Sequence, residues 1–183
     1  MNNIILLSVI ILLLFMIITA YNSFVSLKNM VKDSFSNMDV YLKKRWDLIP
    51  NLMTVVKSYA QHEKDVFTKI SELRSIPYNQ IPENEKINLN KKLYSELNKI
   101  MLIVEAYPEL KANENFLKLN TQLIEIEDDI ANSRKYYNAV VREYNTKVET
   151  FPFNILAMIF NFKTEKMFEI NNIQRESVSI DLW

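Results

Sequence analysis

The sequence contains neither glycine nor cysteine among its 183 residues. Glycine-rich nucleotide loops need glycine to bring the backbone close to phosphate, so the absence of glycine excludes these motifs. Tight hairpins of the primed types lose their usual residue as well, which disfavours an all-β fold. Without cysteine there is no disulfide and no thiolate metal site. These absences favour a helical protein without a nucleotide fold.

An excess of charge of either sign is also lacking. The chain has 22 Lys and Arg against 22 Asp and Glu, and its formal net charge is zero. This balance removes the electrostatic basis for nucleic-acid binding, so we expect no nucleic acid among its partners. Hydrophobic residues make up 49% of the chain, enough for one globular domain of ordinary size.

An apolar run lies near the N-terminus, at residues 4–20, "IILLSVIILLLFMIITA". As a helix it would span about 25 Å, near the lower limit for crossing a bilayer. A cleaved signal peptide would need a basic start, and "MNN" has none. We therefore predict a single-pass membrane anchor over residues 1–21, with Tyr21 at the headgroups. Lys28 and Lys32 follow this anchor, which favours a cytoplasmic domain.

Behind the anchor, apolar residues recur every three or four positions, as on one face of a helix. Four such stripes predict four helices, and their short connections predict an antiparallel up-and-down four-helix bundle over residues 22–150. The alternative is one long helix kinked at Pro50, giving a three-helix arrangement. The expected core residues are Phe24, Val31, Phe35, Met38, Leu42, Leu52, Met53, Val56, Ala60, Phe67, Ile70, Leu73, Leu93, Leu97, Ile100, Val104, Phe116, Leu119, Leu123, Ile126, Ile130, Tyr137, Val140, Tyr144 and Val148.

Proline marks the first expected corner, at "DLIP", residues 47–50. Proline lacks an N–H and disfavours α conformation in the residue before it, so the first helix should end near Leu48 or kink there. Pro50 would then occupy the first turn of the second helix, and Asp47 would cap it.

Proline also marks the later corners. Pro77 and Pro82 bracket an expected loop, "PYNQIP". Pro108 should separate the third helix from the fourth, and Asn113 should cap the fourth. No proline interrupts residues 4–48, so the anchor and the first helix should form one rod.

The only histidine, His62, lies in "QHE" and resembles the phosphoacceptor of sensor-kinase helices only as a dipeptide. We interpret it as an exposed helix residue. A di-iron site needs two Glu-x-x-His motifs, and one histidine excludes it. The acidic run 125–130, "EIEDDI", could hold a divalent cation, form a solvated face, or pair with the basic run 43–45. We expect no catalytic, cofactor or metal-binding residue.

Two tyrosines and two asparagines lie near each other in the fourth helix. Tyr137 and Tyr144 fall on the core stripe, where a tyrosine usually packs and makes one hydrogen bond. Asn138 and Asn145 lie next to that stripe, seven positions apart. Buried asparagines can fix helix register, and we predict that role for both.

Four motifs in order resemble the LemA family: "DLIPNL" (47–52), "VKSYAQHE" (56–63), "EAYPELKANENF" (105–116) and "RKYYNAVVREYNTKVETFP" (134–152). The family usually has glycine where this chain has Ser58 and Asn161, and tyrosine where it has Trp46. The motif residues that we single out as structural are Asp47, Pro50, Asn51, His62, Tyr107, Pro108, Asn113, Tyr137, Asn138, Tyr144, Asn145 and Pro152.

The resemblance implies a membrane-tethered four-helix bundle without established enzymatic activity. Some relatives carry a lipoprotein cysteine in place of the anchor, which places their domain outside the cytoplasm and opposes the lysine argument; we favour the extracytoplasmic side. The family is encoded beside membrane metalloproteases or small exported proteins, which implies a protein partner. We therefore expect a non-enzymatic scaffold or interaction module of the bacterial cell envelope; the alternative is an envelope-stress or signalling adaptor that binds a small ligand or divalent cation.

The C-terminal segment, residues 151–183, begins with the apolar run 151–162, "FPFNILAMIFNF". A four-helix path would return this run to the bilayer, where it could lie along the surface with Lys163 and Lys166 at the headgroups. It could equally cap the open end of the bundle or join two copies in a homo-oligomer. The residues expected at the membrane are Tyr21, Phe153, Phe160 and Phe162.

Overall fold

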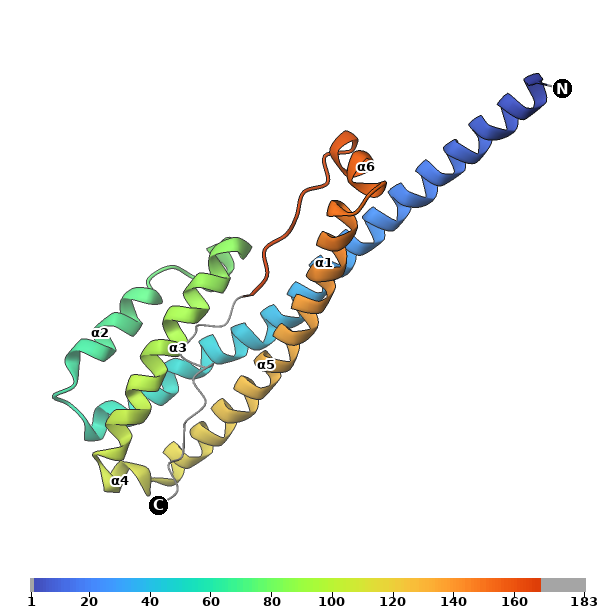
Figure 1. Ribbon diagram of the computed structural model, residues 1–183. Helices are drawn as coiled ribbons and strands as arrows, with labels where there is room; N and C mark the ends of the chain where they lie inside the picture. Colours follow the sequence, from blue (N-terminus) through green and yellow to red (C-terminus); the bar gives the residue numbers. More distant parts are fainter. Residues whose placement is uncertain (1, 169–183) are drawn as a thin grey trace, which may run out of the picture. The chain divides into compact units, whose positions relative to one another are not determined.

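The computed structural model describes residues 2–168, and these residues form helices and no strand. The predicted all-α class with a long apolar N-terminal helix is confirmed. Figure 1 shows the elements in chain order. They are α1 (Asn2–Tyr59), α2 (Lys64–Leu73), the 3-10 turn η1 (Tyr78–Gln80), α3 (Glu83–Glu105), α4 (Pro108–Lys111), α5 (Glu114–Glu149) and α6 (Phe153–Ile159).

The described chain divides into two compact units. Unit 1 contains residues 2–38 of α1 and residues 132–168, which include the end of α5 and all of α6. Unit 2 contains residues 39–131. The predicted anchor and the beginning of the predicted C-terminal segment therefore belong to the same unit; residues 169–183 of that segment lie outside the described residues.

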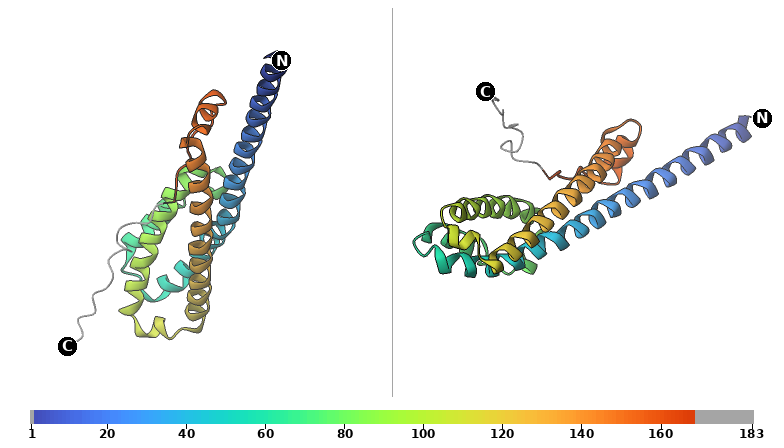
Figure 2. Two further views of the ribbon diagram at one scale, coloured as in Figure 1. Left: turned by 45° about the vertical axis from the view of Figure 1, so that its right-hand side comes forward. Right: turned by 90° about the horizontal axis from the view of Figure 1, so that it is seen from below.

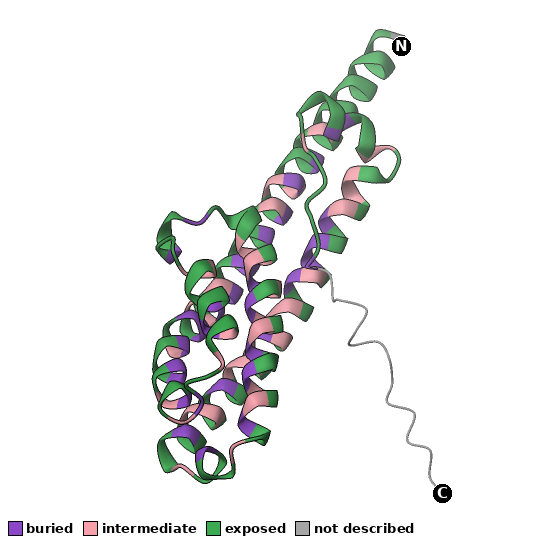
Figure 3. Ribbon diagram, turned by 90° about the vertical axis from the view of Figure 1, so that its left-hand side faces the viewer, coloured by how far each residue is buried: buried purple, intermediate pink, exposed green. Residues whose placement is uncertain are grey.

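The first five turns of α1 expose their apolar side chains, whereas later turns bury one stripe (Figure 3). Residues 3–19 are exposed apart from the half-buried Ile17, and burial begins at Ala20 and Phe24. The most apolar window of α1 has a mean hydropathy of 3.0 and is 6% buried, so it is not the core helix of a soluble protein. Within the described residues, α1 alone is long and apolar enough to cross a membrane.

The predicted end of the first helix at Pro50 is wrong, because α1 continues through Pro50 as far as Tyr59, as in the alternative of one long helix. In a helix, residue 50 would donate its N–H to the carbonyl of Trp46, and proline cannot. The Arg74 guanidinium donates to that carbonyl instead. Asp47 therefore caps nothing: it lies inside α1, where its carboxylate receives Lys43 Nζ at 2.5 Å.

The break between the first two helices lies ten residues later than predicted, at residues 60–63. Ala60 is fully buried, and its carbonyl accepts from the amide of Glu63 at 3.3 Å. His62 is exposed, as expected, but it lies in this turn rather than in a helix. Neither proline nor glycine marks the turn, so the sequence pattern continued the helix through it.

The remaining corners of unit 2 follow the proline pattern. Residues 77–82 form the expected connection, with Tyr78 buried in η1. Pro108 is the first residue of α4. Asn113 caps α5, because its Oδ1 accepts the amides of Asn115 and Phe116 at 2.9 and 3.0 Å.

The predicted core residues are buried, with four exceptions on the flanks of their stripes: Leu73, Leu119, Ile126 and Val148 are half-buried. In unit 1 the stripe of α1 packs on α5, where the rings of Phe35 and Tyr137 meet at 5.9 Å. The up-and-down arrangement of four helices stays a prediction.

Candidate functional site

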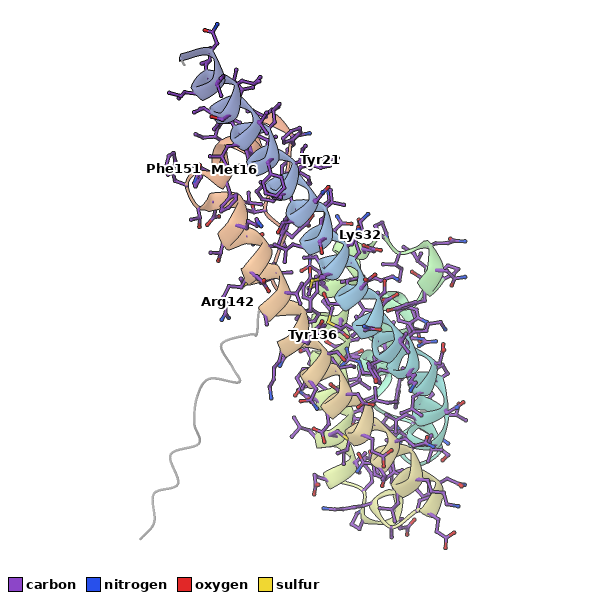
Figure 4. The ribbon with its side chains drawn as sticks, turned by 90° about the vertical axis from the view of Figure 1, so that its right-hand side faces the viewer. Met16, Tyr21, Lys32, Tyr136, Arg142 and Phe151 are labelled. Carbon is purple, nitrogen blue, oxygen red and sulfur yellow. The ribbon has the colours of Figure 1, made fainter. Side chains whose placement is uncertain are left out.

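An aromatic cluster closes the end of unit 1 at which the apolar run of α1 finishes. The ring of Tyr21 lies 5.0 Å from that of Phe160 and 5.9 Å from that of Phe162. Figure 4 labels Tyr21 on α1, with Met16 in the exposed apolar run before it and Phe151 between α5 and α6. The chain after α5 therefore returns to the end of the predicted anchor.

Phe24 forms the centre of this cluster and is fully buried. It stacks on Phe162 at 4.9 Å and meets the edge of Phe153 at 6.4 Å. The ammonium of Lys147 lies over the rings of Phe24 and Phe153, and that of Lys28 lies over Phe162. Phe153 and Phe162 are thus half-buried in unit 1 and do not form its outer apolar surface.

Helix α6 forms that outer surface. Leu156 and Ala157 face inward and are 9% and 2% exposed. The opposite side carries large apolar side chains of which at least half is exposed: Ile155, Met158 and Ile159. Phe151, just before α6, is 74% exposed as well. An exposed apolar surface of this kind, next to an exposed apolar helix, is typical of a contact with lipid or protein.

The chain then turns back at Asn161, whose φ is 57°. Asparagine tolerates this left-handed conformation better than other residues that carry a Cβ. The amide of Phe162 donates to the carbonyl of Ala157 at 2.8 Å, which closes the end of α6. This geometry explains how asparagine can replace the glycine that the family pattern has here.

Residues 163–168, called the strap below, run back along α5 in an extended conformation (Figure 2). Asn145 pairs with both main-chain groups of Glu165: its Nδ2 donates to the carbonyl and its Oδ1 accepts the amide, each at 2.8 Å. Asn138 pairs in the same way with Phe168, at 2.9 and 2.7 Å. The Tyr137 hydroxyl donates to the carbonyl of Lys166 at 2.9 Å.

The spacing of the two asparagines matches an extended chain. Seven helical residues rise about 10.5 Å, and three extended residues span about 10 Å. Asn138 and Asn145, called the asparagine ladder below, therefore meet residues three apart on the strap. From the sequence we predicted that these asparagines fix helix register. In the structure their side chains form hydrogen bonds with the strap.

The strap is held with a small margin. Its five hydrogen bonds to α5 contribute about 1 kcal/mol each. Burial of Phe168, which is 3% exposed, adds about 2 kcal/mol. Ordering the six residues costs about 1–2 kcal/mol each. Gain and cost of ordering the strap are thus similar in size.

Tyr144 lies between the two asparagines on the buried side of α5. It is fully buried, and among the described residues its hydroxyl has no hydrogen-bond partner. Burial raises the pKa of this hydroxyl, and the nearby Glu165 carboxylate raises it further. The Tyr137 hydroxyl thus makes a hydrogen bond, as a core tyrosine usually does, whereas the Tyr144 hydroxyl finds no partner among the described residues.

In unit 2, a buried arginine joins three helices. Arg45 of α1 is 1% exposed, and its Nη1 donates to Glu127 of α5 at 2.5 Å. Its Nη2 donates to the carbonyl of Asn90 in α3 at 3.3 Å. Of the three alternatives for the acidic run 125–130, pairing with the basic run 43–45 is observed for one pair, Glu127 and Arg45.

A second polar cluster surrounds Tyr78. Its hydroxyl donates to Asp39 at 2.5 Å, and Lys86 donates to the other carboxylate oxygen of Asp39 at 2.6 Å. Burial raises the pKa of Tyr78 far above its usual value, and the hydrogen bond to Asp39 adds to this effect. The Tyr78 ring also meets Trp46 at 5.4 Å, on which the Arg74 guanidinium stacks at 4.4 Å.

The sequence predicted no catalytic residue, and the motif residues singled out from it do not include Asp39, Arg45 or Tyr78 of these clusters. Arg45 could have been found, because it lies between Leu42 and Ile49 on the buried stripe of α1.

Among the described residues, no group of three acidic or histidine side chains is placed to hold a metal ion. An open pocket of about 370 Å³ lies between α2 and α3, and it is lined by Lys69, Glu72, Leu73, Lys92, Ser95 and Glu96.

The other predicted motif residues lie at helix boundaries or on the surface. Tyr107 precedes α4, and its carbonyl accepts the amide of Lys111 at 3.1 Å. Pro152 follows a cis peptide bond and precedes α6. Asn51 is exposed near the C-terminal end of α1. None of the three lies in the aromatic cluster around Phe24 or on the asparagine ladder.

A family model described as "LemA family" matches residues 34–182. Two relatives named "Magnetosome protein MamQ 2", from Paramagnetospirillum magneticum, and "Magnetosome protein MamQ", from Magnetospirillum gryphiswaldense, are 27% and 26% identical to this chain over 175 and 174 residues. The match covers 81% of this chain and 64% of each relative. A "Protein LemA" from Metamycoplasma hominis is 24% identical over 152 residues, or 82% of this chain and 69% of that protein.

Proposed function

Because this chain belongs to the LemA family, we propose that it is a membrane-anchored, non-enzymatic scaffold or interaction module of the bacterial cell envelope. It spans 64% of the length of the MamQ relatives, so their roles as whole proteins do not pass to it directly. Its partners in this proposal are the lipid bilayer and a protein, for which the family suggests a membrane metalloprotease or a small exported protein.

One observation supports the membrane part of this proposal above all. Two exposed apolar surfaces, the start of α1 and the outer side of α6, lie at the same end of unit 1. Tyr21 joins them through its contacts with Phe160 and Phe162. We place the bilayer at this end: α1 enters it up to Tyr21, and α6 lies along its surface with Met158 and Ile159 in the acyl region.

A depth measurement on the full chain tests this placement. The chain has no cysteine, so a single cysteine can carry a nitroxide label at Met158→Cys in lipid nanodiscs. The matched control is Leu102→Cys on α3, another apolar side chain that is 73% exposed, against 84% for Met158. We expect the label at 158 to be quenched by oxygen, which dissolves in lipid, and the label at 102 by a water-soluble nickel chelate.

Equal access of the nickel chelate to both labels would show that α6 does not lie in the membrane. The apolar side of α6 would then be a protein contact, as in the alternatives of a bundle cap or an oligomer contact. The anchor would be unaffected, because α1 enters the bilayer independently of α6.

We place the helical part on the extracytoplasmic side, from the resemblance to relatives with a lipoprotein cysteine. Ser36→Cys adds a thiol at an exposed position of α1. In intact cells it should react with a membrane-impermeant maleimide. Reaction only after lysis would place the domain in the cytoplasm, as Lys28 and Lys32 suggest.

A further inference from the structure

We propose that the asparagine ladder of α5 is a binding site for an extended polypeptide segment of a partner protein, and that the strap is its resident occupant. The inference rests on the proposed function only in assuming that a protein partner exists. It assigns that partner a chemistry: an extended segment with free main-chain groups at two positions three residues apart, and a large apolar side chain at the second position.

The ladder contacts main-chain atoms of the strap. Each asparagine carboxamide donates to one main-chain carbonyl and accepts one main-chain amide, at Glu165 and at Phe168. Tyr137 adds a bond to the carbonyl of Lys166. All five hydrogen bonds end on main-chain atoms, so this site recognises the peptide backbone and not the strap's polar side chains.

One side chain of the strap, that of Phe168, is buried at this site. Residues 163–167 are exposed, whereas Phe168 is buried, with the guanidinium of Arg134 at 5.8 Å from its ring. Main-chain hydrogen bonds supply affinity for any extended segment, and such a pocket adds selectivity, as in other peptide-binding sites that read the backbone. An aromatic or large aliphatic side chain therefore defines the segment that fits.

Helix α5 holds the ladder in place whether or not a peptide is bound. Asn138 and Asn145 lie seven residues, or about two turns, apart on one continuous helix. Their separation is therefore fixed before any peptide binds. A site on a rigid element loses little freedom on binding. The strap competes for the site in cis, and a partner segment must displace it.

The test uses the full chain in detergent, so its outcome does not depend on how α6 meets the membrane. In the opened variant, Glu165→Pro with Phe168→Pro, both amides that donate to the ladder and the buried ring are removed. The probe is a fluorescent peptide with the sequence of residues 161–170, and binding is measured by anisotropy. We expect the opened variant to bind this probe at least about tenfold more tightly than the wild-type chain, in which the strap occupies the ladder.

Two matched controls separate recognition of the backbone from unspecific adhesion. Asn138→Asp with Asn145→Asp, added to the opened variant, keeps the shape of both side chains but places a carboxylate against each peptide carbonyl. It should weaken binding about tenfold or more. A probe methylated on the amides of Glu165 and Phe168 should bind equally poorly, whereas alanine at Lys163, Thr164 and Lys166 of the probe should change affinity by less than about threefold.

Failure of the opened variant to bind the probe, with its helix content intact by circular dichroism, overturns the proposal. So does binding that survives the two aspartates. A wild-type chain that dimerises through the ladder, in a way that Asn138→Asp with Asn145→Asp abolishes, would make a second copy the ligand and would overturn the assignment to a different protein.

Discussion

The guanidinium of Arg74 donates to the main-chain carbonyl of Trp46, the carbonyl that Pro50 leaves without its helical partner. It also stacks on the Trp46 ring at 4.4 Å. Burial lowers the pKa of Arg74, and the negative charge of Asp47 opposes this effect. One side chain from the end of α2 thus replaces the hydrogen bond that proline removes from α1, which lets α1 continue to Tyr59.

This relationship predicts that the contributions of Arg74 and Pro50 to stability are coupled. Arg74→Met should lower the free energy of unfolding by about 1–3 kcal/mol, since it leaves a buried carbonyl unpaired. In the Pro50→Ala background the same change should cost less, because the new amide at residue 50 can donate to Trp46. Urea denaturation of the full chain in detergent, followed by circular dichroism, gives all four free energies.

The matched control for this cycle is Arg142→Met, at an exposed position of α5 (Figure 4), which should change stability by less than about 0.5 kcal/mol. Additive costs of Arg74→Met and Pro50→Ala would show that the carbonyl does not link the two residues.

Pro50 also shows how far the sequence alone could lead. The period of apolar residues predicted the all-helical class and nearly all of the core, because a helix must bury one face whatever its neighbours are. The corner at Pro50 was wrong because its compensation comes from Arg74, a residue 24 positions away that no local rule connects to Trp46. The turn at Ala60 was missed for the opposite reason, since no helix-breaking residue marks it.

The candidate site could also be predicted only in part from the sequence. The sequence singled out Asn138 and Asn145 as a pair beside the core stripe and predicted that they fix helix register. Their partner could not be found from α5, because the strap contributes only main-chain atoms to them, and main-chain atoms leave no pattern in a sequence. Phe153 and Phe162 were predicted at the membrane because a four-helix path returns the apolar run 151–162 to the bilayer. In the structure both rings meet Phe24 and are half-buried, and the sequence does not show which apolar residues of the run make this contact.

The Arg45–Glu127 pair should be more important for stability than the surface pairs. The Arg45 side chain is 2% exposed, so Glu127→Gln leaves a buried cation without its counter-charge and should cost about 3 kcal/mol. Arg45→Met with Glu127→Gln should recover most of that loss. The control is Lys43→Ala, which breaks an exposed pair with Asp47 and should cost less than about 1 kcal/mol. Equal costs in urea denaturation for Glu127→Gln and Lys43→Ala would contradict this ranking.

Tyr78 should make the protein less stable in alkali. Its pKa is raised in the folded protein, so the folded state keeps the phenol proton at a pH where the unfolded state, with a pKa of about 10, releases it. The unfolded state then binds fewer protons, and the free energy of unfolding falls as the pH rises above about 10. Tyr78→Phe should reduce this slope, and the exposed Tyr136→Phe should not. Identical slopes for wild type and Tyr78→Phe, measured by urea denaturation between pH 9 and 11, would exclude the effect.

Asn113 should stabilise the start of α5 in two separable ways. Its Oδ1 caps the helix, and its Nδ2 donates to the Tyr59 hydroxyl at the end of α1 at 3.0 Å. Asn113→Ala should therefore cost about 1 kcal/mol for the cap and about 1 kcal/mol more for the hydrogen bond to Tyr59. Asn113→Asp keeps the cap and loses only the bond to Tyr59, so it should cost about half as much, and Tyr59→Phe should cost a similar amount.

Asn115→Ala, in the same turn, is the control, because its main-chain amide still reaches Asn113. If Asn113→Asp proves as destabilising as Asn113→Ala in thermal unfolding, the cap is not the source of stability, and the contact with Tyr59 holds this corner alone.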